Sequence, residues 1–207
     1  MKLIYTASQV REAEKPYIEA ADYDGYLMQR AADAVAAEAQ DLLRGKDNAK
    51  ILLLIGPGNN GAATIYAGAR LSAKGHRVDA VIFDPSEKNL ELIAREGGEG
   101  TRVLDPEHTL EHLTGYDLTI DGILGTGSSG AVHGSAGEYL GVLRAAQLDG
   151  KLGAVLAVDT PSGVDNNRGT VHEPSLRADR TVTFIGHKLP AGTCHSLHAG
   201  DSKLYDL

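Results

Sequence analysis

The chain has 207 residues and a formal net charge of −8 at pH 7. This length suits one domain with a sizeable hydrophobic core, and the negative charge argues against a broad nucleic-acid-binding surface. The single cysteine, Cys194, excludes an internal disulfide and a cysteine zinc cluster, and no apolar run approaches the roughly 20 residues that span a bilayer. The first residues also lack the apolar core of a signal peptide. We therefore expect a soluble cytoplasmic protein that binds neither nucleic acid nor a membrane.

Two helices are predicted before residue 50. Thr6 or Ser8 can cap a first helix over residues 9–20, and a second helix extends over about 26–43. The second helix is rich in alanine, which indicates tight packing against a neighbouring element. We expect residues 1–45 to form a helical extension that packs either on the rest of the fold or on a partner.

From residue 50 onward, strands alternate with helices. The apolar run at 51–55 has the composition of a buried parallel strand. The predicted helices of this region are 62–74, 87–96 and 137–147. The further predicted strands are 78–83, 101–104, 118–120, 154–158 and 180–184. This alternation is typical of a Rossmann-like three-layer α/β/α domain with a mainly parallel sheet, here over residues 50–207. We treat residues 1–207 as a single domain, with ligands expected beyond the carboxyl ends of the strands.

A glycine-rich loop, Gly-Pro-Gly-Asn-Asn-Gly over residues 56–61, follows the first strand of this region. Glycines let a backbone approach a phosphate closely, and the N-terminus of the following helix favours an anion. The alternative is a tight turn from strand to helix with no ligand. Asp84, after the next strand, stands where an NAD-dependent dehydrogenase keeps its ribose-binding acid, so that enzyme class is also an alternative.

Two further polar loops follow predicted strands. Asp121 ends a strand and precedes a Gly/Ser/Thr run to Gly130 that can form a nest of backbone N–H groups for an anion. The alternatives are a flexible surface loop and an aspartate that only caps the turn. Asp159 emerges from an apolar strand and can act as a general acid or base, while Ser162 offers an oxygen ligand. Asp159 and Asp165 could instead only cap backbone N–H groups, but three polar loops at one end of parallel strands favour a site.

The three loops together resemble the motifs of the YjeF N-terminal domain family, whose enzymatic members are NAD(P)H-hydrate epimerases. The resemblance covers nearly the whole chain. The matching segments are QVR at 9–11, LMQRAA at 27–32, GPGNNG at 56–61, DGILGTG at 121–127, VDTPSGVD at 158–165, ADRTVTF at 178–184 and Lys188.

The resemblance implies a substrate, a metal ion and a catalytic residue. The substrate is NADHX or NADPHX, the hydrated reduced cofactors with a hydroxyl at C6 of the nicotinamide ring. The family interconverts their R and S epimers, so that a partner NAD(P)HX dehydratase can restore the cofactor. The residues implied to bind the substrate are Asn59, Asn60, Gly61, Gly125, Thr126, Gly127, Ser128, Ser129, Gly130, Ala131 and Asp159.

A potassium ion would be held by Asn60, Asp121 and Ser162. Asp159 is the candidate for proton transfer, and Lys188 either assists it or is a surface lysine. Many relatives are dimers, and the alanine-rich N-terminal helices offer an interface, so a homodimer is a further expectation.

The chain departs from the family pattern in its first loop. The family usually has GNNGGDG, whereas here Ala62 and Ala63 replace the second glycine and the acid. Alanine cannot accept a hydrogen bond from a ribose hydroxyl, a loss of roughly 1–3 kcal/mol, and the methyl of Ala62 is expected to crowd the phosphate. The chain is then either an epimerase with a weaker hold on its substrate or a catalytically impaired nucleotide-binding or scaffold member. Because Asp159 and the residues of the metal site are present, we favour an active epimerase.

Overall fold

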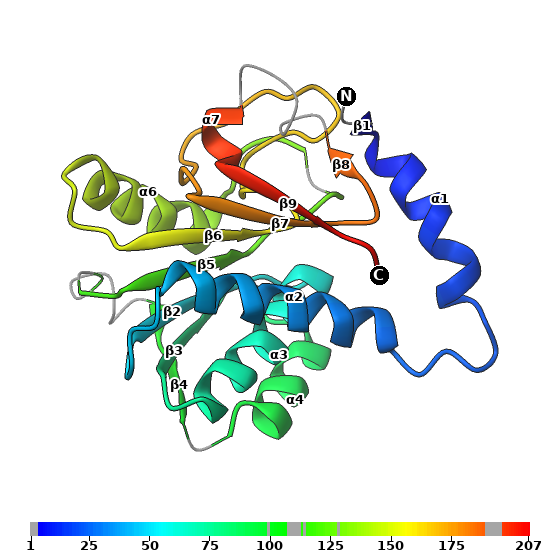
Figure 1. Ribbon diagram of the computed structural model, residues 1–207. Coiled ribbons are helices and arrows are strands. Elements are labelled where there is room, and N and C mark those ends of the chain that lie inside the picture. The colour runs from blue at the N-terminus through cyan, green and yellow to red at the C-terminus, as the bar shows by residue number, and fades with distance from the viewer. Residues whose placement is uncertain (1–3, 99, 107–112, 114, 128, 189–195) are drawn as a thin grey trace.

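The computed structural model describes residues 4–98, 100–106, 113, 115–127, 129–188 and 196–207. The strands of the central sheet are β2 (Lys50–Ile55), β3 (Arg77–Ile82), β4 (Thr101–Leu104), β5 (Leu118–Gly122), β6 (Ala154–Val158), β7 (Arg180–Phe184) and β9 (Asp201–Tyr205). All seven pair in parallel, in the order β4-β3-β2-β5-β6-β7-β9 (Figure 1). The predicted Rossmann-like α/β class is confirmed.

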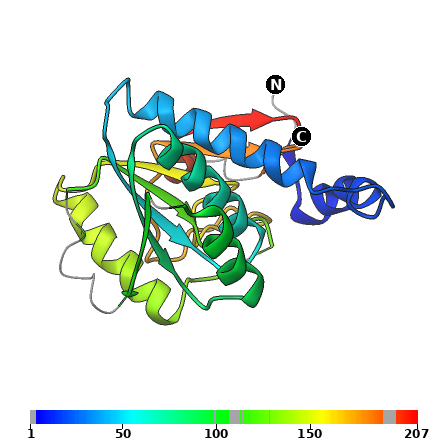
Figure 2. The same ribbon diagram turned by 90° about the horizontal axis from the view of Figure 1, so that it is seen from below.

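Helices cover both faces of this sheet, as Figure 2 shows in a view from below. They are α2 (Tyr26–Leu42), α3 (Asn59–Ala73) and α4 (Glu87–Glu96) on one face and α6 (Gly134–Leu148) on the other, with the short α7 (Ser196–Ala199) before β9. The alternation of side chains along β2 separates two cores. Ile51, Leu53 and Ile55 pack under α2 and α3, whereas Leu52 and Leu54 belong to the core on the α6 side.

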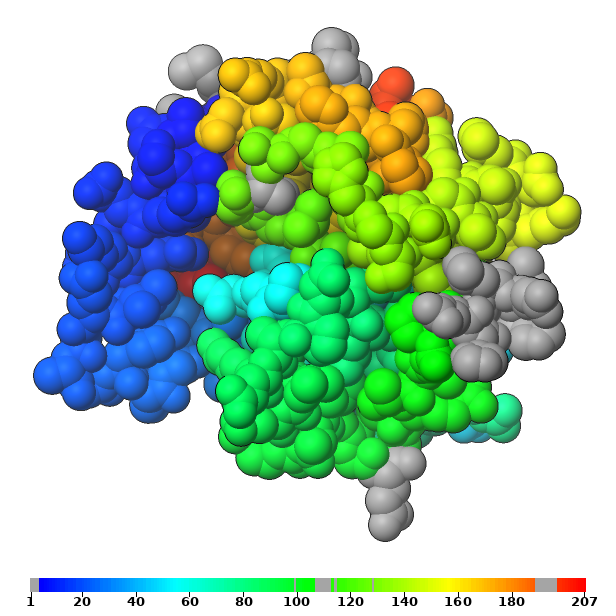
Figure 3. Space-filling model, turned by 180° about the vertical axis from the view of Figure 1, so that it is seen from behind, coloured from blue at the N-terminus to red at the C-terminus, as the bar shows by residue number. Residues whose placement is uncertain are grey.

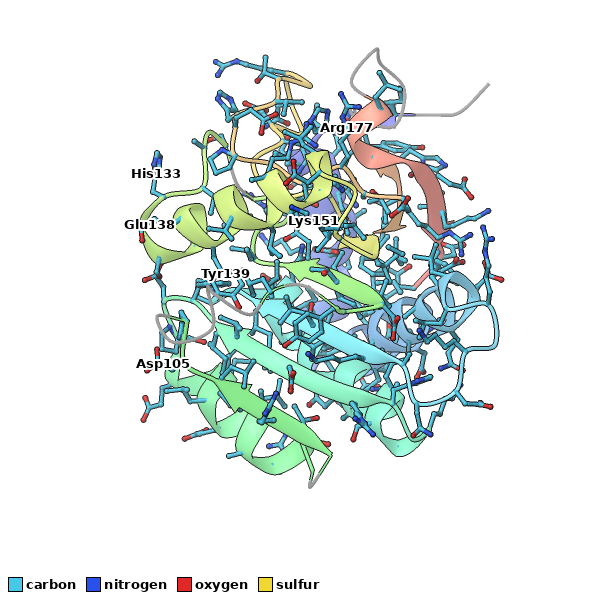
Figure 4. All side chains as sticks on the ribbon, turned by 90° about the vertical axis from the view of Figure 1, so that its left-hand side faces the viewer. Asp105, His133, Glu138, Tyr139, Lys151 and Arg177 are labelled. Atoms are coloured by element: carbon cyan, nitrogen blue, oxygen red, sulfur yellow. The ribbon has the colours of Figure 1, made fainter. Side chains whose placement is uncertain are left out.

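Tyr139 anchors α6 to the sheet. Its ring meets that of Phe83 edge-on, with the two ring centroids 5.3 Å apart. Figure 4 shows Tyr139 between α6 and the strands, whereas Glu138, the preceding residue, points outward. This edge-on geometry is favoured by aromatic pairs and fixes the position of the helix on the sheet.

The two N-terminal helices are placed differently. The small side chains of α2 pack on α3 and on the sheet at β6 and β7. In contrast, α1 (Ala7–Ile18) lies beside the sheet (Figure 1). Thr6 caps α1 in a reciprocal arrangement with Gln9. The start of α1 is held by β1 (Ile4–Tyr5), which pairs in parallel with β8 (His187–Lys188). The N-terminal region was expected to pack either on the rest of the fold or on a partner. Its second helix, α2, packs on the sheet.

Two differences from the predicted elements bear on the site. The helix predicted from residue 62 begins at Asn59, because Gly58 already serves as its N-cap. Asn59 and Asn60 therefore form the first turn of α3 instead of a loop. The strand β9 was not predicted because it is short, partly exposed and contains Asp201 and Lys203; it is stabilised by pairing with β7. In the part of the chain described, no helix is long and apolar enough to cross a membrane.

Candidate functional site

A cleft of about 530 Å³ lies at the carboxyl ends of β2, β5 and β6, beside α1. Figure 3 shows the molecule from behind, with a hollow next to the N-terminal segment. The lining comes from one side of α1, the start of α2, the first turn of α3, the loop after β5, and the pair formed by Asp159 and Lys188. The edge of the sheet at which ligands were expected is therefore hollowed.

Asp159 and Lys188 form a buried ion pair in this lining. The Lys188 ammonium donates to Oδ1 of Asp159, to the hydroxyl of Thr183 at 2.9 Å and to the carbonyl of Phe184 at 2.9 Å. Oδ2 of Asp159 accepts from the N–H of Thr126 at 3.0 Å and from its hydroxyl. Because Lys188 is only 3% exposed, its interpretation as a surface lysine is wrong. Both carboxylate oxygens are thus held in place by donors.

The backbone around this pair is strained. Asp159 has a φ of 67°, and Ile185, in the turn before β8, has a φ of 65°. This left-handed region disfavours residues other than glycine, and β-branched residues most of all. Such strain costs on the order of 1–3 kcal/mol per residue and persists only where surrounding contacts fix it. The cost falls where the chain turns out of β6 and out of β7, so it accompanies the placement of Asp159 and Lys188.

Asp121 is fully buried beneath the cleft. Its carboxylate accepts hydrogen bonds from the N–H of Ser162 at 2.8 Å, from the Ser162 hydroxyl at 2.6 Å and from the N–H of Ile123 at 3.3 Å. Burial raises the pKa of Asp121, and these three hydrogen bonds oppose that rise without reversing it. All three donors are neutral, so the buried carboxyl group lacks a countercharge among the described residues.

The three residues predicted to hold a metal ion belong to one hydrogen-bond network. The side-chain amide of Asn60 donates to the carbonyl of Leu124 at 3.0 Å and to that of Val158 at 2.6 Å. The N–H of Leu124 in turn donates to the Ser162 hydroxyl at 3.0 Å, and that hydroxyl donates to Asp121. The first turn of α3, the loop after β5 and the loop after β6 are therefore joined through Leu124.

The glycines of residues 56–61 have different roles. A Cβ on Gly56 would clash with the carbonyl of Ile123, and a Cβ on Gly61 would clash with the carbonyl of Gly56. These two glycines let neighbouring backbone segments pack closely. Gly58 has open space around it and lines the cleft. A ligand can therefore approach the backbone closely at Gly58, whereas Gly56 and Gly61 let the backbone of the fold pack closely.

The predicted substrate-binding residues divide into two groups. Those that line the cleft are Asn59, Asn60, Gly125, Thr126, Gly127 and Asp159. Gly61 is buried below the cleft, and Ser129, Gly130 and Ala131 lie beyond its lining. Ser128 lies outside the described residues.

Three other positions weighed in the sequence are also placed. Asp84 is exposed and does not line the cleft, so the dehydrogenase alternative loses its ribose-binding acid. Ala63 is 3% exposed and lines the cleft, where it presents a methyl group in place of a carboxylate. Ala62 belongs to the hydrophobic core and does not line the cleft. Its methyl therefore does not crowd the cleft, contrary to the expectation from the sequence.

One wall of the cleft was missed by the sequence reasoning. Val10, Arg11, Glu14 and Ile18 of α1 all line it. Their spacing of one, three and four residues places them on one side of a helix. That spacing was the available signal, but two of the four residues are charged, and a charged side is ordinarily solvated.

Comparison with known proteins agrees with the resemblance seen in the motifs. The chain matches the family described as YjeF-related protein N-terminus over residues 25–189. It is 31% identical over 192 residues to the bifunctional NAD(P)H-hydrate repair enzyme Nnr of Mycobacterium tuberculosis, covering 91% of this chain and 38% of that protein. It is 36% identical over 183 residues to the NAD(P)H-hydrate epimerase of Microbacterium testaceum, covering 87% of this chain and 68% of that protein. The chain therefore spans about two fifths of the bifunctional relative's length.

The fold has a solved counterpart. The crystal structure of yeast ynu0 is similar to this chain with a TM-score of 0.79, covering 99% of this chain and 88% of that chain. The sequences are 19% identical, so this likeness concerns the fold.

Proposed function

Because the chain belongs to the YjeF-related protein N-terminus family, we propose that it interconverts the R and S epimers of NADHX and NADPHX. The observation that supports this most directly is the buried Asp159–Lys188 pair in the lining of a cleft of about 530 Å³. A cleft of this size lies within the ordinary range of small-molecule sites. The Microbacterium testaceum relative is named as an NAD(P)H-hydrate epimerase.

Asp159 is our candidate for the proton transfer. Inverting C6 requires either that the carbon loses its hydroxyl and regains water, or that the ring opens and closes again. Both routes move a proton on or off oxygen, which a positioned carboxylate can do. Lys188 and Thr126 hold the two carboxylate oxygens, so Asp159 meets the substrate in one orientation.

The nucleotide phosphates are proposed to lie at the start of α3, beside Gly58 and Asn59. The N-terminus of a helix offers unpaired N–H groups and the positive end of its dipole. No side chain caps α3, and Gly58 leaves open space in front of its first turn. Gly125 and Gly127 would supply further backbone contacts from the loop after β5. Since Ala63 offers no acceptor to a ribose hydroxyl, we expect a weaker hold than a carboxylate there would give.

A potassium ion is proposed to be held by Asn60, Asp121 and Ser162. The donor set fits, because an amide oxygen, a hydroxyl and one carboxylate are hard oxygen ligands. Asp121 also fits, because it is a buried carboxyl group whose partners are all neutral. When bound, the ion would neutralise Asp121 and hold the first turn of α3 against the loop after β6.

The partners expected from the sequence belong to this proposal. An epimerase of this kind supplies its product to an NAD(P)HX dehydratase, and the Mycobacterium tuberculosis relative is named as a bifunctional repair enzyme. A cytoplasmic location is proposed together with that partner. The homodimer stays a prediction.

The decisive assay combines the purified protein, potassium, an R/S mixture of NADPHX and a dehydratase specific for the S epimer. We expect the protein to accelerate consumption of the R epimer, and the same assay with NADHX measures its preference. Asp159→Asn should slow the reaction by about 100-fold or more, because removal of a general acid or base typically costs 10²–10⁴ in rate.

A wild-type protein that leaves the R epimer untouched would make the epimerase proposal wrong. Calorimetry with NADPH then decides between the remaining interpretations. Binding without turnover would indicate an impaired nucleotide-binding member of the family, whereas absence of binding would indicate a scaffold.

A further inference from the structure

One side of α1 faces the cleft across from the carboxyl ends of the strands. Val10, Arg11, Glu14 and Ile18 lie on this side, and all four line the cleft together with Asp159. Side chains three and four residues apart on a helix are neighbours, so Glu14 lies beside Arg11 in the middle of this wall. Figure 1 shows α1 standing off from the sheet, and Figure 3 shows the hollow beside it. The cleft thus has two walls, one from the strand ends and one from α1.

Glu14 is partly buried and is surrounded by the charged groups of the cleft. Arg11 comes from α1, Lys188 from β8 and Asp159 from the turn after β6. Tyr23, from the connection between α1 and α2, also interacts with it electrostatically. Burial is the largest influence on the pKa of Glu14 and Asp159 is the next; both raise it, and Lys188 and Arg11 lower it by less. Glu14 therefore holds a proton more readily than an exposed glutamate does.

We propose that Glu14 is a second catalytic residue of the epimerase, which transfers a proton at C6 from the wall opposite Asp159. This inference rests on the proposed function. Inversion of C6 by loss and return of water needs the oxygen to leave one face of the ring and return on the other. A carboxyl group fixed in one wall serves the face turned towards it. Two carboxyl groups on facing walls serve both faces.

The proton transfers balance over one turnover. The protonated carboxyl group of Glu14 gives its proton to the C6 hydroxyl, the C6–O bond breaks, and water leaves with the electron pair of that bond. C6 is then a trigonal, planar carbon in a cation with a C6–N1 double bond, and both of its faces are open to attack. A second water adds its oxygen to the opposite face of C6 and gives a proton to the carboxylate of Asp159. The proton moves from Asp159 back to Glu14 through solvent, and no oxidant or reductant takes part.

Among the described side chains that line the cleft, Glu14 is the one suited to pair with Asp159. The guanidinium of Arg11 offers hydrogen-bond donors and no acceptor, so it suits the binding of an anion. Tyr23 has its pKa raised above the usual 10, chiefly by burial, so it gives up its proton too reluctantly for this role. Lys188 already donates to Asp159. Of these side chains, Glu14 is therefore the remaining carboxyl group that can give and take a proton.

The test compares Glu14→Gln with Glu12→Gln in the assay with potassium, NADPHX and the S-specific dehydratase. Glu12 lies on the same helix, is exposed and does not line the cleft, so it is a matched control. We expect Glu14→Gln to lower kcat by about 100-fold with a small change in KM, and Glu12→Gln to keep wild-type values. Thermal unfolding of both variants checks that α1 remains folded.

The pH profile supplies a readout that a structural role would not change. One proton shared by two carboxyl groups gives a bell-shaped profile of kcat. The alkaline limb reports loss of that shared proton, which this proposal places on Glu14. Glu14→Gln should remove this limb, and Glu14→Asp should restore part of the rate together with the limb.

The outcomes separate this inference from the proposed function. Both the epimerase function and the role of Glu14 are supported if the wild type is active and the Glu14→Gln variant is slow and lacks the alkaline limb. An active wild type with Glu14→Gln within about twofold of its kcat and an unchanged profile overturns the role of Glu14 and leaves the function standing. A slow Glu14→Gln whose profile keeps both limbs also overturns it. An inactive wild type overturns both.

Discussion

Asp79 and Asp121 are both buried carboxyl groups on strands of the central sheet, but their partners differ in charge. Arg102 donates two hydrogen bonds to the two oxygens of Asp79, each at 2.9 Å, and the hydroxyl of Tyr116 donates a third at 2.7 Å. Burial by itself would raise the pKa of Asp79, but the hydrogen bonds from Arg102 and Tyr116, together with the positive charges of Arg102 and Lys50, outweigh it and hold the pKa below its ordinary value. Asp79 is thus an ionised group whose charge is matched within the fold.

Asp121, two strands away in the sheet, has the opposite surroundings. Its three donors, from Ser162 and Ile123, are neutral, and burial keeps its pKa above the ordinary value. Burying a carboxylate without a countercharge is costly, so such a group is retained where something else supplies the charge. A matched buried aspartate stabilises the fold, whereas the unmatched Asp121 is the carboxyl group that the proposed potassium ion would neutralise. Three predictions test this difference.

The largest effect is expected from Asp121→Asn. The neutral amide lacks the negative charge that the proposed potassium ion would neutralise, so the ion should bind weakly. Epimerase activity should then fall by about 100-fold or more. Potassium at 100 times its Kd should stabilise the wild type by about 2.7 kcal/mol and so raise its Tm. The Tm of the variant should not change with potassium. Thermal unfolding in potassium and in a large organic cation measures this. Asp79→Asn is the control, since it should keep the potassium response; equal responses of Asp121→Asn and wild type would contradict the metal site.

A smaller effect, on stability alone, is expected from Asp79→Asn. The amide is a weaker acceptor for the buried Tyr116 hydroxyl, and the loss should amount to about 1–2 kcal/mol. Arg102 is largely exposed, so its ion pair contributes little of this. Urea unfolding measures the loss, and the epimerase assay should give a rate within twofold of wild type. A large loss of activity would show that Asp79 has a role beyond the fold.

The smallest effect is the pH dependence of that stability difference. The folded pKa of Asp79 is lowered from 3.8, so its contribution is fully present above pH 3.8 and is lost as pH falls through the folded pKa. The unfolding free energies of wild type and Asp79→Asn should differ by a constant amount from about pH 7 to 5 and converge below about pH 4. A difference that stays constant down to pH 2 would show that packing, and not ionisation, accounts for the effect.

Much of the fold could be predicted because its signals are local. The apolar run of β2, the helix between Ser86 and Gly97, and the strands at 154–158 and 180–184 are each specified by their own composition and flanking residues. The start of α3 was misplaced because Asn59 and Asn60 look like a loop, whereas Gly58 permits the helix to begin there. The strand β9 was missed because its backbone is ordered by pairing with β7.

In the candidate site too, some features could be predicted from the local sequence and others depend on tertiary packing. Asn60, Asp121 and Asp159 could be singled out because each follows a predicted parallel strand, and the ends of such strands meet at one edge. Their network through Leu124 could not be predicted, because it depends on the packing of three loops. The core position of Ala62 and the cleft position of Ala63 depend on how α3 sits on the sheet.

The sequence by itself determined the alternation of strands and helices over residues 51–184, the parallel class of the sheet and the edge at which polar residues gather, because these follow from composition and periodicity over a few residues. The tertiary structure alone decided that Lys188 is buried against Asp159 and that Glu14 faces the cleft. Lys188 follows β7, and Glu14 belongs to a helix held in place through β1 and β8. Their surroundings are created by contacts between residues far apart in the chain, and no local pattern encodes the burial or the charges that such contacts bring.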